Sequence, residues 1–173
     1  MSLPTCTLFK KLIKRGNLIV SGPRVNTPVK SAMFIFPNLS KDKLNELIAK
    51  DPFSKCDLVA FSTINHWDVK YGNLKKTNSS ISDNTKYYRV TYKLSKDPTT
   101  IQPEISTYMN KLVDQHILRA GGPYLNDKNE ELLIIESKNK ADIKTVSKQS
   151  PLTTQFDAIY QIAEWDPRFE DFK

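Results

Sequence analysis

The sequence predicts an α+β fold made of two related halves. Segments with strand-like and helix-like patterns alternate along the chain, and one half repeats the order of the other. The chain has 173 residues, of which 39% are hydrophobic and 26% charged. This composition supports a packed core and excludes wholesale disorder. The apolar runs are far shorter than the ~20 residues that a membrane-spanning helix needs.

An internal repeat defines the two halves. Residues 8–25 (LFKKLIKRGNLIVSGPRV) align with residues 108–125 (YMNKLVDQHILRAGGPYL) at an offset of 100. Residues 58–68 (LVAFSTINHWD) align with residues 156–166 (FDAIYQIAEWD) at an offset of 98. So small a drift indicates an internal duplication. The expected divisions are a first repeat at 1–70, a polar linker at 71–86 and a second repeat at 87–173.

The second repeat contains a full set of elements. Aromatic and β-branched residues predict a strand at Tyr87–Leu94, and apolar spacings of three and four predict a helix after Pro103. The expected elements that follow are a strand into Gly121-Gly122-Pro123, a buried strand at 131–136, a helix at 138–149 and a closing strand at 156–165. The order β-α-β-β-α-β is that of a ferredoxin-like unit.

The first repeat follows the same order from its first helix onward. Phe9, Leu12 and Ile13 form an apolar stripe, and Gly16 suits the left-handed residue that ends a helix. Ser40 is a suitable N-cap for a helix at 41–50. Within that helix the residues expected to face inward are Leu44, Leu47 and Ile48, and the closing strand is expected at 58–68.

This repeat lacks a counterpart of the strand at Tyr87–Leu94, because only a few residues precede its first helix. A ferredoxin-like sheet would hold that strand at its centre. A shortened chain, a strand donated from elsewhere or a rearranged sheet would each account for the difference.

The net charge of +7 is unevenly placed: residues 1–70 carry 11 Lys and Arg against five Asp and Glu. Of the 26 basic residues 21 are Lys, whereas nucleic-acid readers depend on Arg. Nucleic-acid binding is therefore not expected, and a solvated lysine-rich face is. Contact with an acidic partner through the basic N-terminal half stays open as an alternative.

The two cysteines, Cys6 and Cys56, are too few for a disulfide framework and lack CxxC spacing. No signal peptide is evident at the N-terminus. A reducing, cytoplasmic location is therefore expected. The chain contains no GxGxxG, GxxxxGK[ST], HExxH or GxSxG motif. We accordingly expect no cofactor and no metal.

Two motifs in a fixed order resemble the YCII-related family. Residues 16–23 read Gly-Asn-Leu-Ile-Val-Ser-Gly-Pro, and Asp51-Pro52-Phe53 follow; the second repeat has the looser Ala120-Gly121-Gly122-Pro123 and Ser150-Pro151-Leu152. The resemblance covers nearly the whole chain apart from the linker. It implies a dimeric α+β barrel, in which the sheets of two subunits face each other. In a tandem repeat, one chain would build that barrel as a pseudo-dimer.

The family is proposed to use a histidine on the first helix together with the aspartate of the D-P motif. The aspartate is present as Asp51, and Ser150 stands in its place in the second repeat. The positions of the histidine hold Thr5 and Ile105, neither of which makes a general base. Catalysis is therefore expected to be weak or lost.

The candidate catalytic residues are Asp51 and His66. His66 could replace the missing base by reaching Asp51 or Cys56 across a pocket. The alternatives are that Asp51 caps a turn, that His66 is an ordinary polar residue at a strand end and that Cys56 is inert. His116, at a helix end, is expected to be structural.

The candidate ligand-binding residues are Arg24, Ser21 and Trp67. Arg24 is a cation beside the Gly-Pro turn that could hold a carboxylate. Trp67 and its repeat partner Trp165 are more simply explained as core residues or as contacts between the repeats.

The expected function is that of a YCII-like small-molecule-binding module. The alternatives are an active lyase, isomerase or hydrolase on a small carbonyl-bearing metabolite, and an interaction module for an acidic partner. No membrane partner is expected. The assembly is expected to be a pseudo-dimeric monomer or a homodimer.

Overall fold

The computed structural model of the protein describes residues 11–74, 85–95 and 102–167. The expectations for Thr5, Cys6 and Phe9, and most of the predicted linker, lie outside the described residues.

Seven strands form one antiparallel sheet in the described part of the chain, in the order β2-β1-β7-β4-β6-β5-β3. The strands are β1 (Val20–Val25), β2 (Ala32–Ile35), β3 (Tyr71–Gly72), β4 (Lys86–Lys93), β5 (Leu118–Pro123), β6 (Glu130–Ser137) and β7 (Ile159–Trp165). The helices are α2 (Lys41–Lys50), α3 (Pro52–Lys55), α4 (Gln102–Asp114), α5 (Lys140–Gln149) and α6 (Pro151–Phe156).

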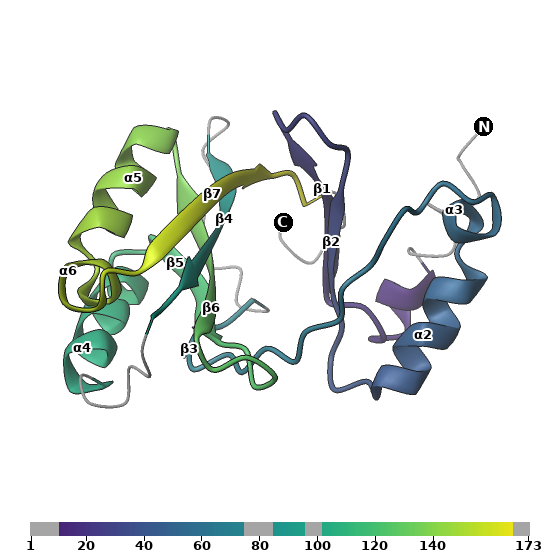
Figure 1. Ribbon diagram of the computed structural model, residues 1–173, viewed down its shortest axis with the longest axis horizontal. Coiled ribbons are helices and arrows are strands. Elements are labelled where there is room, and N and C mark those ends of the chain that lie inside the picture. Colours follow the sequence, from purple (N-terminus) through teal and green to yellow (C-terminus); the bar gives the residue numbers. More distant parts are fainter. Residues whose placement is uncertain (1–10, 75–84, 96–101, 168–173) are drawn as a thin grey trace.

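The second half is a ferredoxin-like unit, as the sequence predicts. Its four strands lie in the order β7-β4-β6-β5, so the first strand of the unit is central and pairs on both sides. Helices α4, α5 and α6 cover one face of the sheet (Figure 1). The core between them includes Ile105 and Met109 from α4 and Ile143 from α5, all fully buried.

The described part of the first half contributes fewer strands to the sheet than the second half. Its β1–β2 hairpin packs beside residues 11–14, which are helical, and α2. The predicted N-cap is confirmed, because the Ser40 hydroxyl accepts a hydrogen bond from the Lys43 amide at 3.3 Å. The apolar side of α2 also follows the prediction, although its residues are only half-buried: Leu44, Leu47 and Ile48.

The predicted closing strand at 58–68 is wrong. Residues 58–66 form no strand, and pairing with β5 begins with a bridge between Trp67 and Tyr124 before β3. In the second half, the closing strand β7 pairs with β4 along its whole length. The described part of the first half has no counterpart of β4, so residues 58–66 have no such ladder. Leu58 and Phe61 are accordingly 69% and 81% exposed.

The sheet curls, so that the β1–β2 hairpin faces β4 and β6 with the helices of each half on the outside (Figure 1). The structure is therefore an α+β half-barrel. The two halves join along β1 and β7 on one side, where Arg24 and Val25 pair with Trp165 and Glu164. They join along β5 and residues 67–72 on the other.

Matching hydrogen bonds close both junctions. The Trp165 indole Nε1 donates to the Gly22 carbonyl oxygen at 3.0 Å, and the Trp67 indole Nε1 donates to the Gly122 carbonyl oxygen at 3.0 Å. The following amides of Asp166 and Asp68 donate to the carbonyl oxygens of Pro23 and Pro123, both at 3.0 Å. The expectation that the tryptophans are contacts between the halves is therefore confirmed.

The Gly-Pro pairs lie within strands β1 and β5 and not at turns, which corrects the sequence-based expectation. A Cβ atom on Gly22 would collide with the Asp166 carbonyl oxygen, and one on Gly122 with the Asp68 carbonyl oxygen. Both glycines therefore permit the close approach of the other half.

Candidate functional site

The inner face of the curled sheet is lined by alternate residues of its strands. On β4, Tyr88, Val90 and Tyr92 belong to the core under the helices. Because successive side chains of a strand point to opposite faces, Arg89 and Thr91 point to the inner face. On β1, Val20 packs in the inner cluster, so Arg24, four residues later, lies on the same face.

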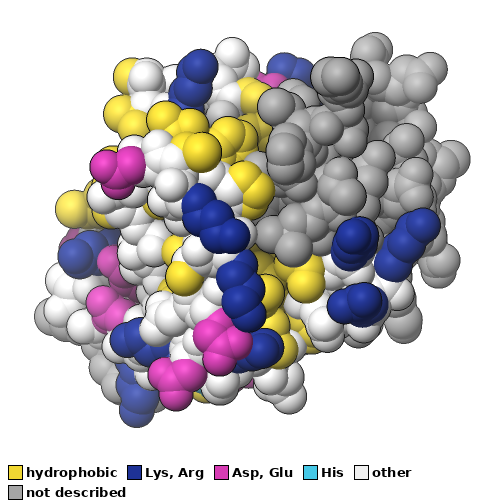
Figure 2. Space-filling view, turned by 90° about the vertical axis from the view of Figure 1, so that its right-hand side faces the viewer, with side chains coloured by type: hydrophobic (Ala, Val, Ile, Leu, Met, Phe, Trp, Pro, Cys, Tyr) yellow, Lys and Arg dark blue, Asp and Glu magenta, His cyan; other side chains and the backbone are white. Residues whose placement is uncertain are grey.

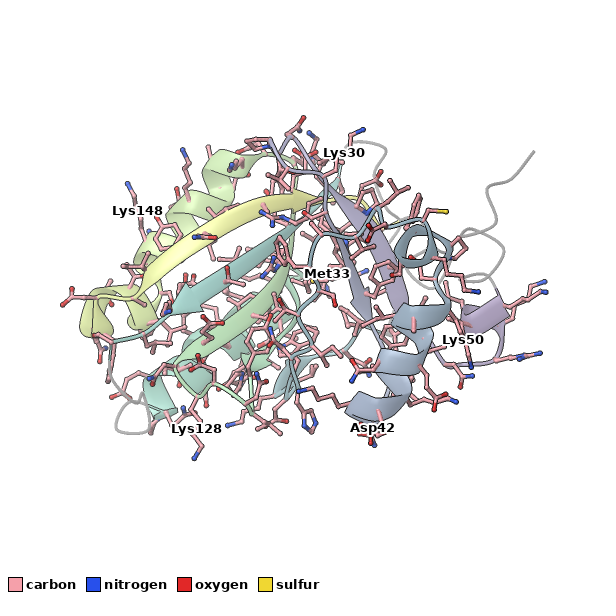
Figure 3. The ribbon with its side chains drawn as sticks, turned by 45° about the vertical axis from the view of Figure 1, so that its right-hand side comes forward. Lys30, Met33, Asp42, Lys50, Lys128 and Lys148 are labelled. Atoms are coloured by element: carbon pink, nitrogen blue, oxygen red, sulfur yellow. The ribbon has the colours of Figure 1, made fainter. Side chains whose placement is uncertain are left out.

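A second hydrophobic cluster fills part of the space between the halves. It includes Val20 of β1, Ile134 of β6 and Trp165 of β7, with Met33 of β2 packed against it. Met33 lies between the hairpin and the second-half sheet (Figure 3). This apolar packing holds the two halves in place around the rest of the inner face.

A cavity of about 310 Å³ opens on this inner face. It is lined by residues of β1, β4 and β7: Arg24, Arg89, Thr91, Gln161, Ile162 and Ala163. Both halves therefore contribute to it, since β1 belongs to the first half and β4 and β7 to the second.

The cavity is electropositive. The Nε atoms of Arg24 and Arg89 are both buried and have no hydrogen-bond partner in the described part of the chain. Burial lowers the pKa of Arg24, and the positive charge of Arg89 lowers this pKa further. The Arg119 Nε, by contrast, pairs with the Glu136 carboxylate at 2.9 Å.

The carboxylate beside Arg24 in the sheet is engaged elsewhere. Glu164 lies next to Trp165, the residue that pairs with Arg24. Its Oε1 forms an ion pair with Lys86 Nζ at 2.9 Å, and its Oε2 accepts a hydrogen bond from Asn26 Nδ2 at 3.1 Å. Glu164 therefore does not compensate the two arginines.

Of the predicted ligand-binding residues, the structure places Arg24 in the cavity. Ser21 is buried on the opposite face of β1, because its position in the strand alternates with that of Val20. Trp67 packs against the inner cluster with its indole bonded to Gly122, and it does not line the cavity.

The predicted catalytic pair is not brought together. Asp51 caps α3: its Oδ2 accepts hydrogen bonds from the amides of Phe53 at 3.1 Å and Ser54 at 3.2 Å. The His66 side chain is exposed, and its amide donates to Asn126 Oδ1 at 2.9 Å. No hydrogen bond or ion pair joins Asp51 to His66 in the described residues.

Two further predicted residues occupy ordinary structural positions. Cys56 is exposed and follows α3. His116 has a φ of 58°, and Gly16, at the equivalent place in the first half, has a φ of 68°. Both residues end a helix in the left-handed conformation, as expected for Gly16.

Sequence reasoning missed Arg89. The segment KYYRVTYK reads as a strand, and its alternation places Arg89 opposite the buried Tyr88 and Val90. A charge at such a position is ordinary when that face is solvated. Here the face is covered by the other half, and the sequence of β4 alone carries no signal for that.

Other features carry less chemical signal. The described residues contain no group of His, Cys, Asp and Glu that could hold a metal ion, and no described helix is long and apolar enough to cross a membrane. On the face shown in Figure 2, Lys and Arg side chains are interspersed with hydrophobic and acidic ones. This arrangement is that of a solvated surface.

No family model matches the chain, and no curated protein matches it. A solved crystal structure from Fusobacterium nucleatum subsp. nucleatum, named "putative monooxygenase", is similar with a TM-score of 0.54. The match covers 96% of this chain and 87% of the other at 13% identity. At this identity the likeness concerns the fold alone: the chain has the α+β barrel fold of that protein.

Proposed function

We propose that the protein is a small-molecule-binding module of the YCII-like type with weak or lost catalysis. The observation that carries the proposal is the cavity of about 310 Å³ on the inner face, to which both halves contribute. Its volume is at the lower end of that of small-molecule sites. The ligand would therefore be small.

The side chains around the cavity favour binding over catalysis. None of the six lining residues has a carboxylate, an imidazole or a thiol. These are the groups that most often act as general bases or nucleophiles. Asp51 caps a helix and His66 faces the β5–β6 turn, so the proposed site does not include the pair expected from the sequence.

We further propose that the chain arose by tandem duplication within the dimeric α+β barrel group. The matching contacts of Trp67 and Trp165 support this origin, because their partners, Gly122 and Gly22, are offset by the same distance as the aligned repeats. A cytoplasmic location stays a prediction.

A second candidate function is enzymatic, on a small carbonyl-bearing substrate. The named monooxygenase supports it only through the shared fold. Any molecule that binds should therefore also be incubated with the protein and followed by mass spectrometry. A product that depends on Arg89 or Thr91 would favour the enzyme over the binding module.

A thermal-shift screen of the full chain against a library of small metabolites tests the main proposal. A ligand at 100 times its Kd should add about 2.7 kcal/mol of stability. Ala163→Leu, which fills the cavity, should abolish the shift, whereas the exposed Ala49→Leu on α2 should retain it. Chemical-shift mapping of the wild type gives the same answer if Ala163→Leu does not fold. The proposal is wrong if no molecule binds, or if binding maps away from β4 and β7.

A further inference from the structure

We infer that the cavity binds the oxyanion group of a small molecule, a carboxylate or a phosphate, between Arg24 and Arg89. This inference rests on the proposed small-molecule site and specifies its ligand class. The two guanidinium groups come from strands of different halves and line the same cavity.

The first step is the unmet hydrogen-bonding capacity of the two arginines. Both Nε atoms are buried, and neither has a partner in the described part of the chain. A buried donor without a partner is costly, and two like charges that share a cavity repel each other. An oxyanion between them would relieve both penalties at once, because it accepts hydrogen bonds and carries the opposite charge.

The second step is the choice of residue type. Only five of the 26 basic residues of the chain are Arg, and two of these five line this one cavity. The planar guanidinium presents a fork of donors that matches carboxylate and phosphate oxygens, whereas a lysine ammonium is a point charge. A surface that only needed positive charge would follow the lysine bias of the rest of the chain.

The third step is the remainder of the lining. Thr91 and Gln161 supply a hydroxyl and an amide that can bond further oxygen atoms. Ala163 supplies apolar surface for a short carbon skeleton, whereas the Ile162 side chain points to the other face of β7 and packs against the core under the helices. The cavity therefore suits a small organic acid or phosphate ester.

Calorimetric titration of the full chain with three probes tests the inference: succinate, its neutral analogue succinamide, and inorganic phosphate. Succinate, phosphate or both should bind, and succinamide should bind at least tenfold more weakly than succinate or not at all. The relative affinities of succinate and phosphate then identify which oxyanion the site prefers.

Charge-neutralising variants assign the effect to the cavity. Arg24→Gln and Arg89→Gln should each weaken binding of the preferred anion at least tenfold. Lys128→Gln removes the same charge from an exposed loop at the other end of the second half (Figure 3) and should leave the affinity unchanged. Arg89→Lys retains the charge but not the fork, and should bind with intermediate affinity; it also replaces Arg89→Gln if that variant does not fold.

The outcomes separate this inference from the proposed function. The inference is overturned if succinate and succinamide bind with equal affinity. It is also overturned if Arg24→Gln and Arg89→Gln each bind the anion as tightly as the wild type. If neutral library molecules bind at β4 and β7 while no acid does, the ligand class is wrong and the binding function stands. If nothing binds in either experiment, both are wrong.

Discussion

Glu131 on β6 illustrates how one buried carboxyl group affects the stability of the whole protein. It is 2% exposed, and its Oε2 has no partner in the described residues. Burial raises its pKa to about 7, against an opposing effect of Lys70. Between its ordinary pKa of 4.5 and about 7, the folded protein holds a proton that the unfolded chain has released.

The free energy of unfolding should therefore fall as the pH rises through this window. The loss from Glu131 should be about 3 kcal/mol in total, since each pKa unit corresponds to about 1.4 kcal/mol. Urea unfolding at pH 4.5, 6 and 7.5 measures it. Glu131→Gln should remove most of this slope and be the more stable protein at pH 7.5. An unchanged slope in the variant would exclude Glu131 as its source.

Asp51 allows a capping role to be separated from a role in the site. Asp51→Ala should lower the free energy of unfolding by about 1 kcal/mol, because the amides of Phe53 and Ser54 lose their acceptor. Asp51→Asn should retain nearly all of this stability, since Asn is an equally good N-cap. Chemical denaturation measures both variants. If Asp51→Asn abolishes ligand binding, Asp51 belongs to the site after all.

The sequence predicted Arg24 as a ligand-binding residue, but it did not predict Arg89, the second arginine of the cavity. Arg24 could be identified because it follows a Gly-Pro motif that recurs in the second repeat. Asp51 follows from the D-P motif and His66 from its ability to act as a base, but the distance between them depends on a predicted strand at 58–68 that does not form. Arg89 is 65 residues from Arg24 in sequence, and only the curl of the sheet brings the two together.

Among the elements, strand β1 lies against the backbone of the other half at Gly22. Gly22→Ala should lower the free energy of unfolding by about 3 kcal/mol or more, because its Cβ would meet backbone atoms of Asp166 and Pro167 that cannot turn aside. Chemical denaturation with an intrinsic fluorescence readout is suitable, since Trp165 lies at this junction.

Gly16→Ala is the matched control. Its Cβ would have nothing within 4 Å, and only its φ of 68° opposes the substitution. The expected loss is about 1 kcal/mol. If the two alanine variants were equally stable, close packing at Gly22 would not be what holds β1 to β7.

The elements of the second half were predictable because each carries its own pattern. Apart from Glu131, the residues of β4 and β6 are aromatic or aliphatic at the buried positions, and α5 stops before Pro151. Residues 58–66 carry an equally apolar pattern, yet form no strand. A strand needs a partner as well as a pattern, and the pattern of 58–66 says nothing about its missing neighbour.

Across the molecule, stability should be distributed unequally between the halves. Strand β4 pairs on both sides and lies over the larger core. In native-state hydrogen exchange, the amides of Val90 and Tyr92 should therefore exchange most slowly, and those of residues 59–65 within the first time points. Slow exchange at 59–65 would instead indicate that this segment is paired in solution.

The repeat predicted two related halves, and the resemblance to the dimeric α+β barrel group implied that their inner surfaces face each other. The junctions were not, because they depend on which carbonyl oxygens the two tryptophans reach. Trp165 and Trp67 read as large apolar residues in the sequence, whereas their indole N–H groups determine the register of the contact.

The β1–β7 junction is a short one: in register it joins only Arg24 to Trp165 and Val25 to Glu164. Arg24 is therefore both a strand residue at the seam and a wall of the cavity, while Arg89 belongs to the opposite side of that seam. A ligand held by both would act as a cross-link between the halves. Its binding energy would oppose their separation, so that the free energy holding the first half against the second would increase with the ligand concentration.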